Sequence, residues 1–157
     1  MSARTPTSSD PKPLVQAACV CERVIVEPDN VPSLIRVVDT YFLSPIPPNL
    51  GVPAAVELTL FICLRSGDVR GEFEVAIRFV PPDNKTSIRR WAVDFGEGAE
   101  NGVNLRIAFL LQEPKLELYW FDLLWGEEVL TRIPVRFKPR SEEPTLDVMR
   151  PNEMTNR

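Results

Sequence analysis

Apolar and polar residues alternate along most of the chain. A period of two residues is typical of β-strands that turn one face toward a core. The longest regular stretch begins at Val56, where every second residue to Leu64 is a large aliphatic side chain. The pattern predicts seven or eight strands. They cover 17–27, 33–43, 56–65, 72–79, 87–95, 103–112, 116–124 and 129–137.

Short turn-forming stretches separate these segments, such as Ser66-Gly-Asp68, Gly96–Gly102 and Gly126–Glu128. Turn signals that recur about every 10–12 residues are typical of two-sheet architectures. The sequence contains no clear amphipathic helix. We therefore expect an all-β fold, a two-sheet antiparallel β-sandwich of immunoglobulin-like type with seven to eight strands.

Proline and polar residues mark the ends of the predicted domain. Residues 1–13 and 139–157 have too little apolar surface to offset the entropy of ordering. We expect both to be disordered tails around a β-sandwich domain that spans 14–138. The proline-dense stretch 45–53 is predicted to be an extended crossover between strands.

Three stretches resemble a bacterial family of small proteins whose domain has no assigned function. They are Cys21–Ile35, Gly71–Asp83 and the pair Leu118–Leu123 with Leu130–Val135. The resemblance covers most of 17–137 and rests on strand and turn patterns. It implies an immunoglobulin-like sandwich, and it brings no catalytic residues to this chain.

Composition and charge narrow the range of partners. The chain has 157 residues, with 18 Lys and Arg against 22 Asp and Glu, and a formal net charge of −4. A binder of nucleic acid or of an anionic membrane would carry a basic surface, so we expect neither partner. No apolar run approaches the ~20 residues of a membrane span, and no signal peptide is visible. We expect a cytoplasmic protein.

Histidine is absent from the chain. This excludes Ser-His-Asp and Cys-His nucleophile systems and His-ligated zinc. The three cysteines, Cys19, Cys21 and Cys63, form no disulfide framework. The first two share one strand face, where small apolar packing is favoured over a metal site. We expect no catalytic, cofactor-binding or metal-binding residues.

Two groups of charged residues are candidates for binding a ligand, one for calcium and one for an anion. Asp94, Glu97 and Glu100 flank a glycine-rich loop and suggest a calcium site, although the Asp-x-Asp-x-Asp spacing is absent. Arg89 and Arg90 are adjacent, so they are predicted to point to opposite faces. Several outward arginines are expected to pair with glutamates rather than to bind an anionic ligand. These are Arg106, Arg132 and Arg136, with Glu72, Glu74 and Glu117 as partners.

The strand 116–124 is apolar on both faces. Either Tyr119, Phe121 and Leu123 point into the core or the assignment is reversed. A sandwich strand normally has one solvated face, so either another segment covers the outer face or this face binds another chain. The predicted interaction surface includes residues from two predicted strands and a turn. These residues are Leu116, Leu118, Trp120, Ala108, Leu110 and Trp125.

The leading functional hypothesis is a non-enzymatic protein-interaction or assembly module, whose partner is another protein or a second copy of the chain. One alternative is a ligand-binding sandwich of carbohydrate or calcium/lipid type. The other is a histidine-free enzyme that uses carboxylates and arginine.

Overall fold

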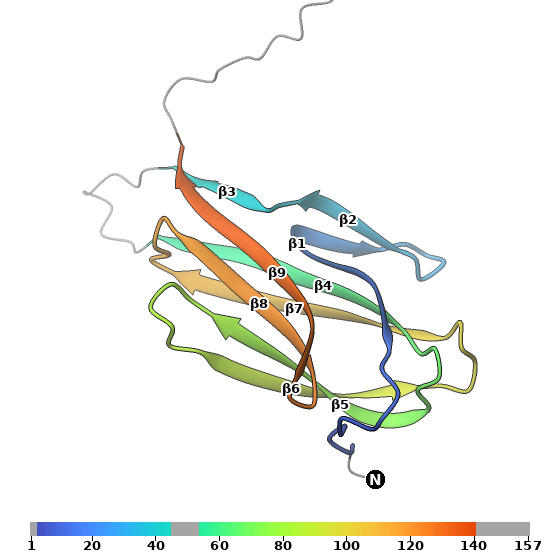
Figure 1. The fold of residues 1–157 in the computed structure, drawn as a ribbon. Coiled ribbons are helices and arrows are strands. Elements are labelled where there is room, and N and C mark those ends of the chain that lie inside the picture. The colour runs from blue at the N-terminus through green and yellow to red at the C-terminus, as the bar shows by residue number, and fades with distance from the viewer. Residues whose placement is uncertain (1–2, 45–53, 141–157) are drawn as a thin grey trace, which may run out of the picture.

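Nine strands form two facing sheets in the computed structural model, which describes residues 3–44 and 54–140 (Figure 1). The predicted crossover at 45–53 and residues 141–157 of the predicted tail lie outside the described residues. The two-sheet, all-β architecture expected from the alternating pattern is confirmed.

Each sheet combines strands that are distant in sequence. The four-stranded sheet has the order β2 (Pro32–Val37), β1 (Leu14–Val26), β4 (Ala55–Arg65), β7 (Gly102–Gln112). The five-stranded sheet has the order β3 (Thr40–Leu43), β9 (Glu128–Pro139), β8 (Leu118–Trp125), β5 (Gly71–Val80), β6 (Ser87–Phe95). All neighbouring pairs are antiparallel except β3 and β9, which are parallel.

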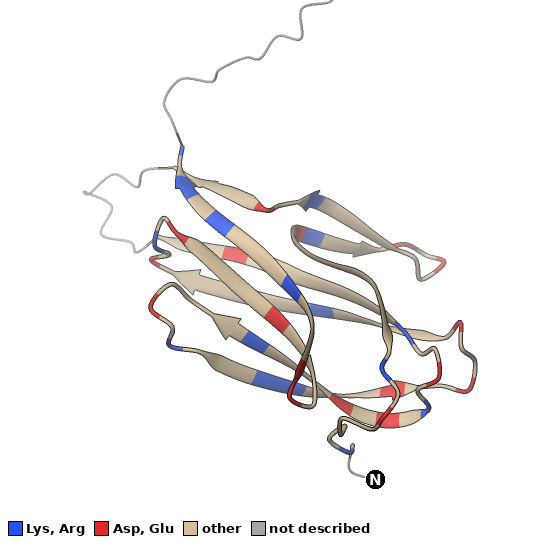
Figure 2. Ribbon diagram, in the orientation of Figure 1, with Lys and Arg blue, Asp and Glu red and all other residues tan. Residues whose placement is uncertain are grey.

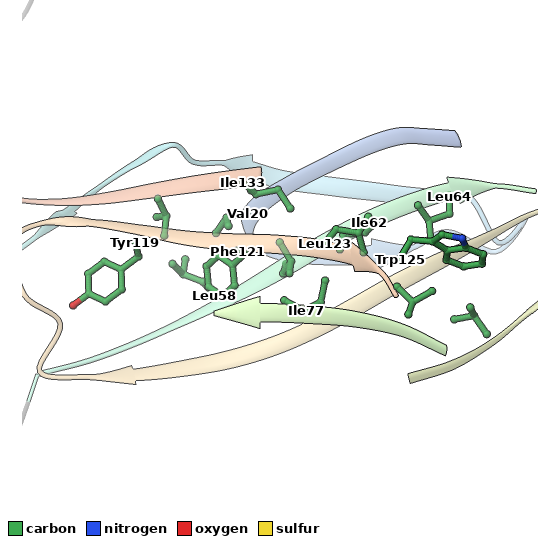
Figure 3. Packing of buried hydrophobic residues seen from close by; sticks show 14 of the residues in the cluster. Val20, Leu58, Ile62, Leu64, Ile77, Tyr119, Phe121, Leu123, Trp125 and Ile133 are labelled. Atoms are coloured by element: carbon green, nitrogen blue, oxygen red, sulfur yellow. The ribbon is translucent and has the colours of Figure 1, made fainter. Parts of the chain in front are cut away.

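The core lies between the sheets and follows from the alternating pattern. Alternate residues of β4, from Leu58 to Leu64, are at most 1% exposed. They face the inward residues of β8, among them Tyr119, Phe121 and Leu123, which are at most 5% exposed. Figure 3 shows these side chains packed between the two layers. The first of the two orientations considered for strand 116–124 is therefore the one the protein adopts.

The segment predicted as one strand over 33–43 forms two strands in different sheets. β2 pairs with β1, whereas β3 pairs with β9. The chain leaves the first sheet near Arg36, which has a φ of 52°, and the Val38 N–H donates to the Val20 carbonyl oxygen at 2.8 Å. β2 carries β-branched residues and β3 carries a β-branched and two aromatic residues. Both compositions are typical of strands, so they do not reveal the break.

The described part of the N-terminal segment, residues 3–13, lies against the five-stranded sheet. β8 pairs with β5 only from Val75 onward, which leaves the start of β5 open on that side. The backbone of Arg4 occupies this place. Its N–H donates to the Glu72 carbonyl at 3.4 Å, and its carbonyl oxygen accepts from the Glu74 N–H at 2.9 Å. The sequence predicts a disordered tail over 1–13, and within this segment Arg4 is hydrogen-bonded to the edge of the sheet.

Asp10 folds this segment back on itself. Its carboxylate accepts hydrogen bonds from the Arg4 guanidinium at 2.6 Å and from the Thr7 N–H at 2.7 Å. These bonds, that from Arg4 first, lower the pKa of Asp10 to about 2. The Arg4 guanidinium also lies 4.2 Å from the centre of the Phe73 ring, which fixes the segment through a cation–π contact.

Candidate functional site: an arginine–tryptophan face

The outer face of the five-stranded sheet contains a fully buried charge. Asp122 stands on β8 between two inward residues and therefore points outward, yet its side chain is 0% exposed. The register places Arg78 of β5 on one side of it and Arg132 of β9 on the other. Figure 2 shows an acidic band on β8 flanked by basic bands on the neighbouring strands. Strand pairing thus brings two cations onto one anion.

Both arginines hold the Asp122 carboxylate through two nitrogen atoms each. Arg78 donates to Oδ2 from Nη2 at 2.6 Å and from Nε at 3.0 Å. Arg132 donates to Oδ1 from Nε at 2.7 Å and to Oδ2 from Nη2 at 3.3 Å. Such two-point pairs fix both the position and the plane of a guanidinium group. The arginines are therefore held in place on the sheet surface.

The electrostatic balance of this cluster is positive. Burial would raise the pKa of Asp122, but the hydrogen bonds from Arg132 and Arg78 outweigh it and hold this pKa below its ordinary value. One ionised carboxylate therefore faces two guanidinium groups. The side chains of Arg78 and Arg132 are 33% and 54% exposed, so the excess positive charge is accessible from solvent.

Trp120 lies beside the cluster on the same face. It is half-buried, and the Arg132 guanidinium carbon lies 5.4 Å from the centre of its ring. Leu118 and Arg136 form the next outward pair of β8 and β9. We call this surface the arginine–tryptophan face. It comprises Arg78, Leu118, Trp120, Asp122, Arg132 and Arg136.

The structure divides the predicted interaction surface between two sheets. Leu118 and Trp120 lie on the arginine–tryptophan face, and Leu116 lies in the turn just before β8 and is 52% exposed. Ala108 and Leu110 are exposed on β7, which belongs to the four-stranded sheet and turns them away from this face. β7 and β8 follow each other in sequence, but the chain changes sheets between them.

The placement of Trp125 on an exposed surface is wrong. Its side chain is 2% exposed and points inward, because it stands two residues after Leu123 on the core side of β8. The indole packs against Phe73, with ring centres 4.9 Å apart, and edge-on against Phe95 at 5.8 Å. Trp125 is therefore part of the core.

Neither Arg78 nor Asp122 is among the candidate residues predicted from the sequence, and the glutamate partner predicted for Arg132 is wrong. Arg132 pairs with the buried aspartate rather than with an exposed glutamate. Arg90 does form the expected kind of pair, with Glu74 at 3.1 Å. A signal for Asp122 was present, because it is the only charged residue between Leu118 and Trp125. A lone charge in an apolar strand requires a partner.

A cleft of about 620 Å³ lies between residues 5–8 and the tip of the β8–β9 hairpin. Its acidic side chains are Glu74, Glu127 and Glu128, which are relevant to the enzyme alternative. Glu74 pairs with Arg90 at 3.1 Å, and Glu128 pairs with Lys12 at 2.6 Å. Two of the three carboxylates in this cleft are therefore neutralised by cations.

The cysteines lie on the outer face of the four-stranded sheet. Cys21 and Cys63 are buried and pack with Phe61, and Cys19 is half-buried beside them. Burial raises the pKa of the Cys19 and Cys21 thiols, so both are protonated near neutral pH. Within residues 3–44 and 54–140, no three Cys, Asp or Glu side chains form a metal-binding group, and this includes the loop of Asp94.

The part of the chain that the structure describes contains no helix with the length and hydrophobicity of a membrane span.

Comparison of the chain with protein-family models, with curated proteins and with solved structures finds no match.

Proposed function

We propose that the protein is a non-enzymatic interaction module that binds a partner protein through the arginine–tryptophan face. The observation that carries this proposal is Asp122, which is 0% exposed and fixes Arg78 on one side and Arg132, beside Trp120, on the other. Tryptophan and arginine are enriched among the residues that dominate binding energy at interfaces. A surface that is already ordered loses less conformational entropy when a partner binds.

The charge of this face supports an acidic partner segment. Asp122 engages only Nε and Nη2 of each arginine, so the remaining nitrogen of each guanidinium can donate to a carboxylate of the partner. Trp120 and Leu118 add apolar area next to these donors. We therefore expect a partner segment that combines Asp or Glu with a large apolar side chain.

Selection of peptides from a random displayed library against the full protein tests this proposal. We expect the selected peptides to be rich in acidic and apolar residues. Trp120→Ala and Arg132→Gln should each weaken their binding about tenfold or more, because both side chains would be central contacts. Isothermal titration calorimetry measures the affinities. The matched control is Leu110→Ala, which removes an exposed apolar side chain from the outer face of the other sheet.

Two outcomes would overturn the proposal. One is a selection that yields no peptide discriminating between the wild type and Trp120→Ala. The other is a set of peptides whose binding depends on Leu110 instead. Sedimentation velocity completes the test: a wild-type dimer that Trp120→Ala dissociates would support the same face with a second copy of the chain as its partner.

We also propose that the sandwich is immunoglobulin-like. In that fold, strands B and E share one sheet while C and F share the other. β4 and β7 pair in the four-stranded sheet, and β5 and β8 pair in the five-stranded sheet, which supports this correspondence. Further support comes from Tyr119 at the start of β8, whose hydroxyl accepts from the Lys115 N–H at 2.8 Å. A tyrosine that bonds to the preceding corner of strand F is a hallmark of this fold.

Tyr119→Phe tests the role of this hydrogen bond, which we call the tyrosine corner. The variant keeps the buried ring but leaves the Lys115 N–H without its acceptor, so we expect a loss of about 1 kcal/mol in the free energy of unfolding. Urea denaturation followed by tryptophan fluorescence measures it. Tyr41→Phe is the control, since Tyr41 lies half-buried on β3 and its hydroxyl takes part in none of the hydrogen bonds among the described residues. An equal loss in both variants would argue against the tyrosine corner.

A further inference from the structure

The sandwich is open along one side. β6 is the last strand of the five-stranded sheet and β7 is the last strand of the four-stranded sheet. The inward residues of β7, at alternate positions from Val103 to Leu111, are only half-buried, whereas those of the neighbouring β4 are buried. Apolar side chains that would otherwise belong to the core therefore reach solvent between these two edge strands.

A cavity of about 280 Å³ enters the interior at this opening. Its apolar walls come from both sheets. They include Ile77, Phe79, Trp91, Ile107, Phe109 and Phe121. At roughly 30 Å³ for each water-sized group, the space holds about nine such groups, so it suits a chain or ring of about eight carbons. Concave, mostly aromatic and aliphatic walls with few polar groups are typical of small-molecule sites.

Arg89 is the one charged side chain in the lining of this cavity. It stands opposite the inward-facing Ile77 on β5, so it points toward the space between the sheets. No carboxylate of the described residues forms an ion pair with it. Arg90, the next residue, points to the other face and pairs with Glu74. The cavity therefore carries an available cation beside aromatic and aliphatic side chains.

We propose that this inter-sheet cavity binds a small amphipathic anion, with its apolar chain or ring among Phe79, Trp91 and Phe109 and its anionic head on the Arg89 guanidinium. Arginine matches the geometry of a carboxylate or phosphate head through two parallel hydrogen bonds. The site is independent of the arginine–tryptophan face, because the latter lies on the outer surface of the sheet.

A second copy of the chain fits this opening less well. Edge strands pair with other chains when their faces are flat and apolar, and an inward-pointing charge on an edge strand opposes such pairing. A copy that continued the sheets past β6 would bury the Arg89 guanidinium without a partner, which carries a large desolvation cost. A soluble anion satisfies this group instead. We therefore assign the cavity to a small ligand.

Titration calorimetry with octanoate and with 1-octanol tests the proposal on the full protein. We expect octanoate to bind the wild type more tightly than 1-octanol does. Arg89→Gln should weaken octanoate binding about fivefold and leave 1-octanol binding unchanged, since an exposed ion pair contributes on the order of 1 kcal/mol. Arg90→Gln is the matched control on the opposite face and should bind octanoate as the wild type does.

A second pair of variants locates the ligand. Ser87→Trp places a large ring at the cavity mouth, because Ser87 lines the cavity and is exposed; octanoate binding should be lost. Ile88→Trp, on the outer face, should retain it. The proposal is overturned if the wild type binds neither compound, or if Ser87→Trp binds octanoate normally, which would indicate a surface anion site. A wild-type dimer that Ser87→Trp dissociates would also overturn it in favour of a second copy.

Discussion

Asp122→Ala should lower the free energy of unfolding by about 2 to 3 kcal/mol and abolish binding to the arginine–tryptophan face. Removing one member of a buried ion pair typically costs about 3–5 kcal/mol. The cost is smaller here because Arg78 and Arg132 are 33% and 54% exposed and can regain water. Urea denaturation measures the stability. A loss below about 0.5 kcal/mol would contradict a structural role for this carboxylate.

Asp122→Asn distinguishes the contribution of the carboxylate charge to stability from that of the side-chain volume. The amide keeps the volume of the side chain and one oxygen acceptor, but it presents NH₂ hydrogens to a guanidinium group that has only donors to offer. We expect a destabilisation close to that of Asp122→Ala. If Asp122→Asn had wild-type stability, packing rather than charge would be the contribution of this residue, and the ordering of the two arginines by a carboxylate would be refuted.

The same carboxylate makes stability depend on pH. Its pKa is lower in the folded protein than in the unfolded chain, where an aspartate titrates near 4. Its contribution is therefore complete above the unfolded pKa and is lost as the pH falls through the folded pKa. We expect the stability difference between the wild type and Asp122→Asn to be constant near neutrality and to shrink in acid. Asp10 titrates in both proteins, so it cancels in this comparison.

The sequence predicts which residues of a strand face the core better than it predicts which strands lie side by side. Period-two alternation correctly assigns the inward residues of β4, because burial of one face is a local property of a strand. It leaves both orientations of β8 open, because both faces of that strand are apolar. Arg78 and Arg132 meet Asp122 from strands 44 and 10 residues away. This meeting depends on strand order and register, which the alternating pattern of a single chain does not contain.

The alternating pattern also does not predict where the chain crosses from one sheet to the other. Ala108 and Trp120 both point outward, and both were assigned to one surface, yet they lie on opposite sides of the sandwich. The division of 33–43 into β2 and β3 has the same origin, since each half keeps its strand pattern while the chain crosses between layers. Only tertiary packing determines where a strand of this composition ends.

The largest loss of stability is expected from Phe121→Ala, about 3–5 kcal/mol, because Phe121 joins the two sheets. Its side chain is 4% exposed. Its ring centre lies 5.1 Å from that of Phe79 in its own sheet and 4.6 Å from that of Phe109 in the other. Truncating a buried phenylalanine loses its transfer energy and leaves a void that the surrounding structure fills only in part.

Phe121→Leu makes this prediction useful even if the alanine variant fails to fold. The leucine retains an apolar side chain and should cost about 1 to 2 kcal/mol, whereas Leu110→Ala, at an exposed position, should change stability by less than about 0.5 kcal/mol. Urea denaturation measures the stability of all three variants.

Phe121→Leu also tests whether the two proposed sites are independent. Phe121 points inward while Trp120 points outward, so Phe121→Leu should keep the peptide affinity of the wild type. Since Phe121 also lines the inter-sheet cavity, the same substitution should alter octanoate affinity, which would separate the two proposed sites. A loss of peptide binding in Phe121→Leu without loss of stability would contradict their independence.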